Sequence, residues 1–194
     1  MVNFKEDERL TTLNHSCAHV MAQAVKHLYP HAKFWVGPVV KEGFYYDIDL
    51  GNDVVNDEVI AAIEKEMKKI CKEGKKIYRR EVSKAEAMEM FKDDMYKLDL
   101  ISNLEDGNIT VYDQGDFTDL CRGPHVDNTK LCKNFKTGKT LRSILEGRCQ
   151  QPRNAAYLWC LLPYRRGTGS TSEKSWKRPK SVTTERSARK WNCS

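Results

Sequence analysis

Two pairs of residues in this chain have types and spacing that suit chemistry. His15 and His19 stand four positions apart, and so do Cys121 and His125. On a helix, a four-residue step places both side chains on one face, within reach of a shared atom. Three imidazoles and one thiolate are also a good tetrahedral ligand set for zinc. A second interpretation stays open on the residues alone, namely two core histidines and an unrelated Cys–His pair.

Other polar residues stand close to these pairs in the sequence or repeat their spacing. Asp119 precedes Cys121 by two positions, so on a strand both side chains point to the same face. Lys97 follows a charged stretch, and from the residues alone we interpret it as an exposed lysine. His27 and His31 are also four apart, but they lie at a predicted helix end, and we interpret them as solvated surface residues.

The first pair lies on a helix that we predict at 6–28. Its apolar positions recur in steps of three and four and form one helical face: Leu10, Leu13, Cys17, Val20, Met21, Ala24, Val25 and Leu28. Asn14 is the predicted local cap of the main segment, and Pro30 ends it. The second pair lies in a loop after a predicted strand, because Gly123 and Pro124 separate its members.

Helices and short strands alternate along the rest of the first 136 residues. We predict further helices at 56–72, 83–91 and 96–104, and strands at 34–40, 44–50, 76–82, 108–112 and 116–120. On the second of these strands, Phe44, Tyr46 and Ile48 share one face, which indicates core packing. This order predicts an α+β fold with a largely antiparallel sheet and packed helices.

Composition argues against several classes of protein. No stretch approaches 18 consecutive apolar residues, and the N-terminal MVNFKEDERL lacks the apolar core of a secretory signal. We therefore expect no membrane span and a cytoplasmic location. The 7 cysteines are then expected to be thiols or ligands rather than a disulfide framework.

The charge balance changes near residue 136. Residues 1–136 hold 20 Lys+Arg and 24 Asp+Glu, whereas residues 137–194 hold 13 and 3. The second segment has no Asp and no His, and its last part is basic and rich in Ser and Thr, a composition typical of disorder. We therefore predict a folded domain at 1–136 and a basic, disordered tail at 137–194.

Three separated motifs carry a resemblance to a known family. In order they read HSCAHV, GFYYDID and DLCRGPHV, and together they resemble the editing domain, or second additional domain, of threonyl-tRNA synthetases. Related alanyl-type domains share both pairs but carry Gly-Gly-Thr where Arg122, Gly123 and Pro124 stand here, which favours the threonyl type. The resemblance covers about 13–136. It implies a fold in which the helix with the first pair packs near the sheet with the second.

The resemblance also implies a site and a reaction. The matching cleft residues are His15, His19, Cys121 and His125, with Asp119 as the acid before the cysteine and Lys97 as the family's lysine that follows a tyrosine. The implied activity is hydrolysis of mischarged seryl-tRNA(Thr), a proofreading step in translation, with the acceptor end of tRNA(Thr) as partner. The full-length family is homodimeric.

The resemblance implies that this domain requires no cofactor. Zinc could be held by His15, His19, Cys121 and His125, as in the alanyl-type relatives. The ATP, magnesium and zinc sites of the family belong to its ligase core, whose motifs do not occur in this sequence. Two other functions stay open: a free-standing trans-editing deacylase, and a zinc- or RNA-binding module without turnover.

The chain departs from the family after the loop that ends at His125. The family continues through AYWRGD, LQRIYG and FPTxEELE, and none of these is present. A one-base shift of the reading frame from Arg142 on nevertheless permits GAYWRGD, then QRIYG and EEELE, in the family's order and spacing. We therefore interpret 137–194 as out-of-frame translation, and we expect the chain to be a fragment of a threonyl-tRNA synthetase whose editing domain is truncated at its C-terminal end. The alternative is a genuine basic tail that binds RNA.

Two residues beside the pairs receive expectations of their own. Cys17 lies two positions from each helical histidine and turns away from their shared face, so we expect it to pack like a small apolar residue. Arg122 alternates off the face of Cys121 and suits an RNA phosphate. An ion pair between Arg122 and Asp127 is the alternative.

Overall fold

Helices alternate with short strands along the chain, as the sequence predicts. The computed structural model describes residues 7–37, 39–40, 43–53, 55–140 and 155–161. Its helices are α1 (Glu8–Leu28), α2 (Asp57–Glu73), α3 (Lys84–Met90), α4 (Met95–Ser102) and the 3₁₀ turn η1 (Thr129–Cys132). Its strands are β1 (Lys33–Phe34), β2 (Val39–Val40), β3 (Gly43–Asp49), β4 (Ile77–Val82), β5 (Ile109–Gln114), β6 (Phe117–Leu120), β7 (Lys136–Thr140) and β8 (Ala155–Leu161). The α+β class is confirmed.

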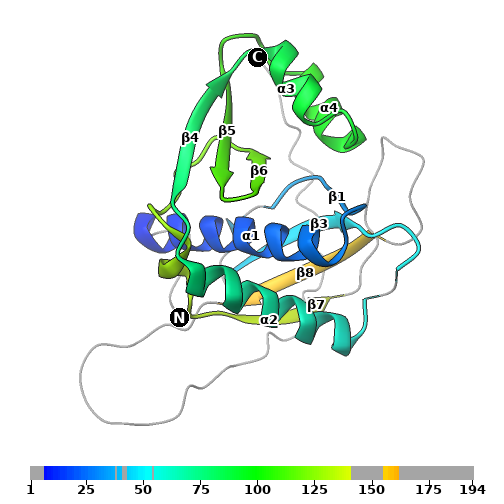
Figure 1. The fold of residues 1–194 in the computed structure, drawn as a ribbon, viewed down its shortest axis with the longest axis vertical. Coiled ribbons are helices and arrows are strands. Elements are labelled where there is room, and N and C mark those ends of the chain that lie inside the picture. The colour runs from blue at the N-terminus through cyan, green and yellow to red at the C-terminus, as the bar shows by residue number, and fades with distance from the viewer. Residues whose placement is uncertain (1–6, 38, 41–42, 54, 141–154, 162–194) are drawn as a thin grey trace. The chain divides into compact units, whose positions relative to one another are not determined.

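The strands form two antiparallel sheets. In the first, β3 pairs with β1 and β2 on one side and with β8 on the other, and β8 pairs with β7. In the second, β5 lies between β4 and β6. Figure 1 shows α1 and α2 side by side along the first sheet, while β5 and β6 also approach α1. The helix that carries the first pair is thus in contact with both sheets.

Local signals explain where the helices begin and end. Asn56 caps α2, and Gly74 ends it in the left-handed conformation at φ 66°. At α3, Ser83 and Glu86 form a capping box, in which each side chain bonds to the other residue's backbone N–H. These interactions lie within a few residues of chain, which is why the bounds predicted for α2 and α3 agree closely with the structure.

The cap predicted for α1 is wrong. Asp7 starts the helix, and its side chain accepts hydrogen bonds from the N–H groups of Arg9 and Leu10. Asn14 instead lies in the helix interior and is fully buried. Neither polar atom of its side chain has a partner among the described residues. Asparagine is favoured at helix caps. Here the helix already begins after Asp7, so Asn14 lies within its regular turns.

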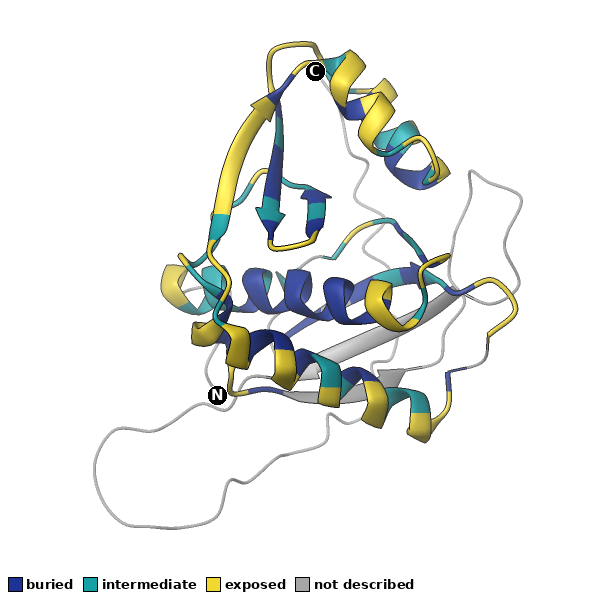
Figure 2. Ribbon diagram, in the orientation of Figure 1, coloured by how far each residue is buried: buried dark blue, intermediate teal, exposed yellow. Residues whose placement is uncertain are grey.

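α1 is the most deeply buried helix of the described residues. Apart from His15, all positions from Asn14 to Val25 are buried, and Figure 2 shows this continuous buried stretch. α2 buries one stripe only, formed by Ile63, Met67, Ile70 and Cys71. Polar side chains in the middle of α1 therefore lie inside the domain. Among the described residues, no helix is long and apolar enough to span a membrane.

The segment expected to be a tail contains two strands. β7 begins at Lys136, and β8 lies in the first sheet between β3 and β7. At these two strands the expectation of an unstructured tail is not met. Residues 141–154 and 162–194 lie outside the described residues. The chain divides into a unit at Met1–Tyr164, which holds every described residue, and a second unit at Arg165–Ser194.

Candidate active site

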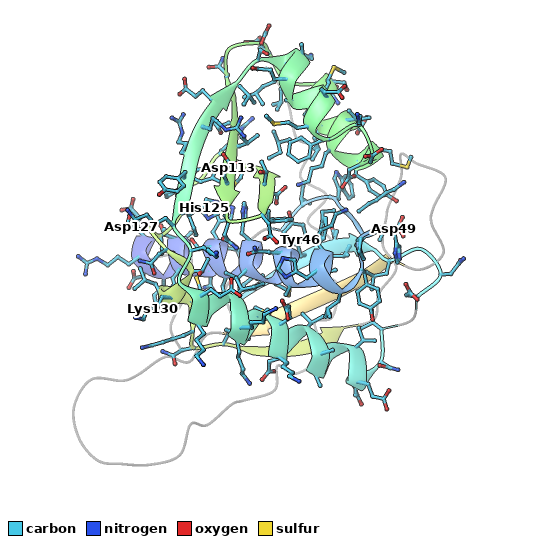
Figure 3. The ribbon with its side chains drawn as sticks, viewed as in Figure 1. Tyr46, Asp49, Asp113, His125, Asp127 and Lys130 are labelled. Carbon is cyan, nitrogen blue, oxygen red and sulfur yellow. The ribbon has the colours of Figure 1, made fainter. Side chains whose placement is uncertain are left out.

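The two predicted pairs come together in one cluster. His15 Nε2 lies 3.1 Å from Cys121 Sγ, and His125 Nε2 lies 3.3 Å from the same sulfur. The His19 ring centroid lies 4.1 Å from that of His125. α1 supplies one pair, and the loop after β6 supplies the other. We call His15, His19, Cys121 and His125 the cleft residues; Figure 3 labels His125 beside α1.

A buried ion pair adjoins the cleft residues. Lys97 Nζ lies 2.6 Å from Asp119 Oδ1, and both side chains are almost fully buried. Asp119 Oδ2 also lies 3.7 Å from His19 Nε2. The structure thus brings all six predicted site residues together. The interpretation of Lys97 as an exposed lysine, made on the residues alone, is wrong, because α4 turns this side chain inward towards β6.

Tyr46 is hydrogen-bonded to this ion pair, although the sequence indicated only that it packs in the core. It is buried on β3 with Phe44 and Ile48, as expected. Its hydroxyl donates a 2.6 Å hydrogen bond to Asp119 Oδ2, and Lys97 Nζ lies 3.5 Å from the same hydroxyl. Burial and the nearby Asp119 raise the pKa of Tyr46 well above its ordinary value, so the hydroxyl keeps its proton. The hydroxyl of a buried tyrosine usually needs a hydrogen-bond partner. A tyrosine predicted to lie in the core could therefore have indicated a polar neighbour at this site.

The buried carboxylate stays ionised because its neighbours outweigh its burial. Burial alone would raise the pKa of Asp119, but the charge of Lys97, the nearby His19 and the hydrogen bonds from Lys97 and Tyr46 lower it below the ordinary value. Lys97 Nζ also lies 3.3 Å from the Trp35 carbonyl oxygen. All three donors of the ammonium group therefore have acceptors inside the protein.

The three cleft imidazoles are neutral at pH 7. Burial lowers the pKa of His15, and it lowers the pKa of His19 to about 4 despite the attraction of Asp119. Burial, together with the two other histidines, also lowers the pKa of His125. Each neutral ring keeps one nitrogen lone pair, which can accept a proton or bind a metal.

The loop from Cys121 to His125 is held in a tight conformation. Gly123 has φ 72°, and its N–H donates to Cys121 Sγ at 3.3 Å. A Cβ atom at Gly123 would collide with the Tyr112 hydroxyl, whose ring also packs against His125 at 4.4 Å between centroids. Burial raises the pKa of the Cys121 thiol to about 11, so the sulfur carries its proton at pH 7.

The cleft residues fit a zinc ion by donor type. Their ligating atoms all lie within 4.8 Å of one another, and neutral imidazoles are the form that binds metal. Binding would also displace the Cys121 proton, since zinc takes a thiolate. The arrangement is therefore consistent with zinc as well as with direct acid–base chemistry.

The remaining expectations concern residues beside the cleft. Cys17 is fully buried in the main core, and its sulfur lies 3.9 Å from the Cys132 carbonyl oxygen, so the prediction of core packing is confirmed. Arg122 is exposed, and among the described residues it has no ion pair with Asp127. His27 and His31 are exposed as expected, yet each lies close to carboxylates, His27 to Glu66 and Asp116 and His31 to Asp53.

Comparison with known proteins agrees with this geometry. Residues 109–142 match the family described as the threonyl and alanyl tRNA synthetase second additional domain. The chain is similar to threonine–tRNA ligases: 46% identity over 151 residues with the enzyme of Desulfatibacillum aliphaticivorans, and 54% over 131 residues with that of Enterococcus faecalis. These matches cover 78% and 67% of this chain.

The chain spans only about a fifth of the length of these relatives, 23% and 20% respectively. The matched family covers β5, β6 and the loop that holds Cys121 and His125. The relatives are aminoacyl-tRNA synthetases of protein biosynthesis. From fold, cleft and similarity together, we conclude that the chain belongs to the editing-domain family of threonyl-tRNA synthetases.

Proposed function

We propose that the cleft hydrolyses the ester bond of seryl-tRNA(Thr). The observation that supports this most is the convergence of neutral histidines on one thiol beside the buried Lys97–Asp119 pair. Serine lacks one methyl group of threonine, which is worth only about 1–3 kcal/mol of discrimination. Synthetases facing such a small difference add a second site that removes the wrong product.

Each residue group has a chemical task in this proposal. A neutral cleft histidine accepts a proton from the attacking water, because its lowered pKa leaves a free lone pair at pH 7. Lys97 supplies a fixed positive charge near the oxyanion or the leaving hydroxyl. Asp119 orients Lys97 and His19, and the protonated Cys121 limits the size of the bound amino-acid side chain.

The test is deacylation by the purified chain. We expect release of serine from seryl-tRNA(Thr), and much slower release of threonine from threonyl-tRNA(Thr). His15→Ala should slow serine release by about 10²–10⁴-fold, the usual worth of a positioned proton-transfer group. Lys97→Ala should slow it by about 10²–10³-fold, the usual worth of a group that stabilises the developing charge. His31→Ala, at an exposed histidine away from the cleft, is the matched control and should leave the rate unchanged. Serine release unaffected by both cleft variants would disprove the assignment.

Zinc binding is a second candidate function, supported by the four close ligating atoms. If zinc is bound, His15, His19, Cys121 and His125 would hold it, and it would lower the pKa of a bound water. Metal analysis separates the two functions. Stoichiometric zinc that chelators remove, without serine release, would favour a binding module. Serine release that persists after chelation would favour the hydrolase.

We further propose that tRNA is the partner and that Arg122 contacts a phosphate. Its exposed guanidinium borders the cleft loop and has no ion pair with Asp127 among the described residues. Arg122→Ala should weaken tRNA binding and reduce the slope of log affinity against log salt by about one. Lys68→Ala, on the exposed face of α2, should change neither by a comparable amount. Equal effects of both variants would contradict the phosphate contact.

A further inference from the structure

Ser16 lies between the two helical histidines and is fully buried, yet it takes no part in the reaction proposed above. A buried hydroxyl is costly unless its hydrogen bonds are satisfied. The Ser16 Oγ atom has three close polar neighbours: the Thr12 carbonyl oxygen at 2.8 Å, the Val126 nitrogen at 2.9 Å and His125 Nδ1 at 3.1 Å. These three contacts join α1 to the loop that carries the second pair.

The protons in this group of atoms can be assigned by counting donors. A hydroxyl donates one hydrogen bond and accepts two. The Val126 N–H can only donate to Oγ, and the Thr12 carbonyl can only accept from it. The contact with the carbonyl is the shortest of the three and has the usual length of an O–H···O bond. Because the Ser16 hydroxyl donates its proton to the Thr12 carbonyl oxygen, the remaining neighbour, His125 Nδ1, must donate a hydrogen bond to Oγ.

We propose that Ser16 is a positioning residue that fixes His125 in its Nδ1–H tautomer and so presents the Nε2 lone pair to the cleft. The other side of the ring is compatible with this assignment. Nε2 lies 3.3 Å from Cys121 Sγ, and that thiol can donate its one proton either there or to His15 Nε2 at 3.1 Å. The partner of one ring nitrogen of histidine sets the state of the other. The tautomer is a property of the folded chain, and its catalytic consequence rests on the proposed hydrolysis.

Three neighbouring rings already confine the His125 ring, so Ser16 supplies what packing cannot. The rings of Tyr112, His15 and His19 lie with centroids 4.1–4.4 Å from that of His125. Such packing restricts where the ring lies, but it does not distinguish one ring nitrogen from the other. A hydrogen bond to Nδ1 does. Loss of the Ser16 hydroxyl should therefore leave the His125 ring in place but allow it to adopt either tautomer.

Nitrogen-15 NMR of the histidine side chains tests the proposal directly. In the unaltered chain we expect His125 to be protonated at Nδ1 and unprotonated at Nε2. In Ser16→Ala we expect a mixture of both tautomers or the Nε2–H form, and in Ser16→Thr, which keeps the hydroxyl, the original form. Nε2–H in the unaltered chain would overturn the proposal even if no variant folds. An unchanged tautomer in a folded Ser16→Ala would also overturn it.

Kinetics then separate this proposal from the proposed function. Ser16→Ala should reduce kcat for serine release by about 10-fold or more with little change in KM, as is usual for a partner that orients a site imidazole, and Ser16→Thr should restore part of it. Ser102→Ala is the matched control, because Ser102 makes the same kind of bond to a helix carbonyl, that of Asp99, at 2.7 Å. If the chain releases no serine but shows the expected tautomers, the hydrolysis fails and the role of Ser16 stands. Unchanged kcat in Ser16→Ala alongside the expected tautomer change would overturn the positioning role.

Discussion

The ion pair of Lys97 and Asp119 depends on both partners being present. Removal of Lys97 leaves a buried carboxylate without its counter-charge, which typically costs about 3–5 kcal/mol. We therefore expect Lys97→Met to lower the unfolding temperature strongly and Lys97→Met with Asp119→Asn to recover part of the loss. Thermal unfolding of the single and double variants measures this.

Lys92 provides the comparison at the surface. It pairs with Glu89 at 2.7 Å, but both side chains are exposed. Exposed pairs contribute little, because water screens them and holding two long side chains has an entropic cost. Lys92→Met should therefore hardly change the unfolding temperature. If Lys92→Met lowered the unfolding temperature as much as Lys97→Met, burial would not explain the effect of losing Lys97.

Asp47 on β3 gives the chain a pH-dependent stability. Burial raises the pKa of its carboxyl from 3.8 to about 7, and one of its oxygens has no partner among the described residues. The folded chain therefore favours the protonated form. The stabilisation is full below about pH 4 and is lost as the pH rises through 7. Asp47→Asn stays neutral, so it should stabilise the chain at pH 8 by on the order of 1–3 kcal/mol and much less at pH 5.

Asp113 should show the opposite trend and serves as the control. The hydrogen bond from Arg80 lowers the pKa of this carboxyl, so its stabilisation is present above its ordinary pKa and is lost as the pH falls. Asp113→Asn should therefore destabilise the chain at pH 8. Denaturant unfolding of both variants at pH 5 and pH 8 gives the two signs. A pH-independent effect of Asp47→Asn would contradict the assignment.

At the scale of elements, the loop between Cys121 and His125 depends on a glycine. Alanine at Gly123 would have an unfavourable left-handed φ and would collide with Tyr112, which packs on His125. Gly107 has φ 89° but open space around it. Both Gly→Ala variants bear the backbone cost of about 1–2 kcal/mol. Only Gly123→Ala should lose further stability, by about 1–3 kcal/mol from overpacking. The same variant should also lose serine release, because the collision displaces Tyr112 and His125. Equal losses in stability would show that the collision is relieved freely.

The sequence predicts elements better than it predicts their partners. α2, α3 and the β5–β6 hairpin follow from periodicity, caps and a glycine turn, all of which act over a few residues. The burial of Lys97 could not be read in this way, because the charged residues near it in sequence suggest a surface and its acidic partner lies on β6. The prediction of a cap at Asn14 was wrong for a related reason. Its residue type favours a cap, but its position inside the helix depends on the contacts of α1 with both sheets. Each pair of cleft residues is local and could be recognised by its spacing, whereas the meeting of the two pairs in one site was implied by the family resemblance.

At the scale of the whole molecule, β8 connects the first sheet. It pairs with β3 on one side and β7 on the other, so its backbone N–H groups face a neighbouring strand. Leu158 stands opposite both Tyr46 and Lys139. Proline at position 158 removes one of these hydrogen bonds from a central strand, so we expect Leu158→Pro to lower the unfolding temperature. An unchanged temperature would instead support the domain boundary at 136 that the sequence indicates.

The origin of the segment from residue 137 is a separate proposal. We propose that it is translated out of frame. The match to the family model ends at residue 142, a few residues past the start of this segment, and the remainder is basic in composition; both observations support the proposal. In the shifted frame, Tyr157 to Cys160 become Ile-Tyr-Gly. The nucleotide sequence decides the matter: codons that do not yield Trp-Arg-Gly-Asp and Arg-Ile-Tyr-Gly in the other frame would exclude it.

The position of β8 also determines how this chain must fold as it is synthesised. β3 lies at 43–49 and its central partner at 155–161, so the sheet closes only after more than half of the chain has emerged. Contacts this distant in sequence are entropically costly to form and slow folding. At about 5–20 residues per second, the chain from Asp49 to Ala155 takes on the order of 5–20 seconds to emerge. During that interval the edge of β3 that β8 will occupy lacks its partner, so it is open to pairing with a neighbouring nascent chain.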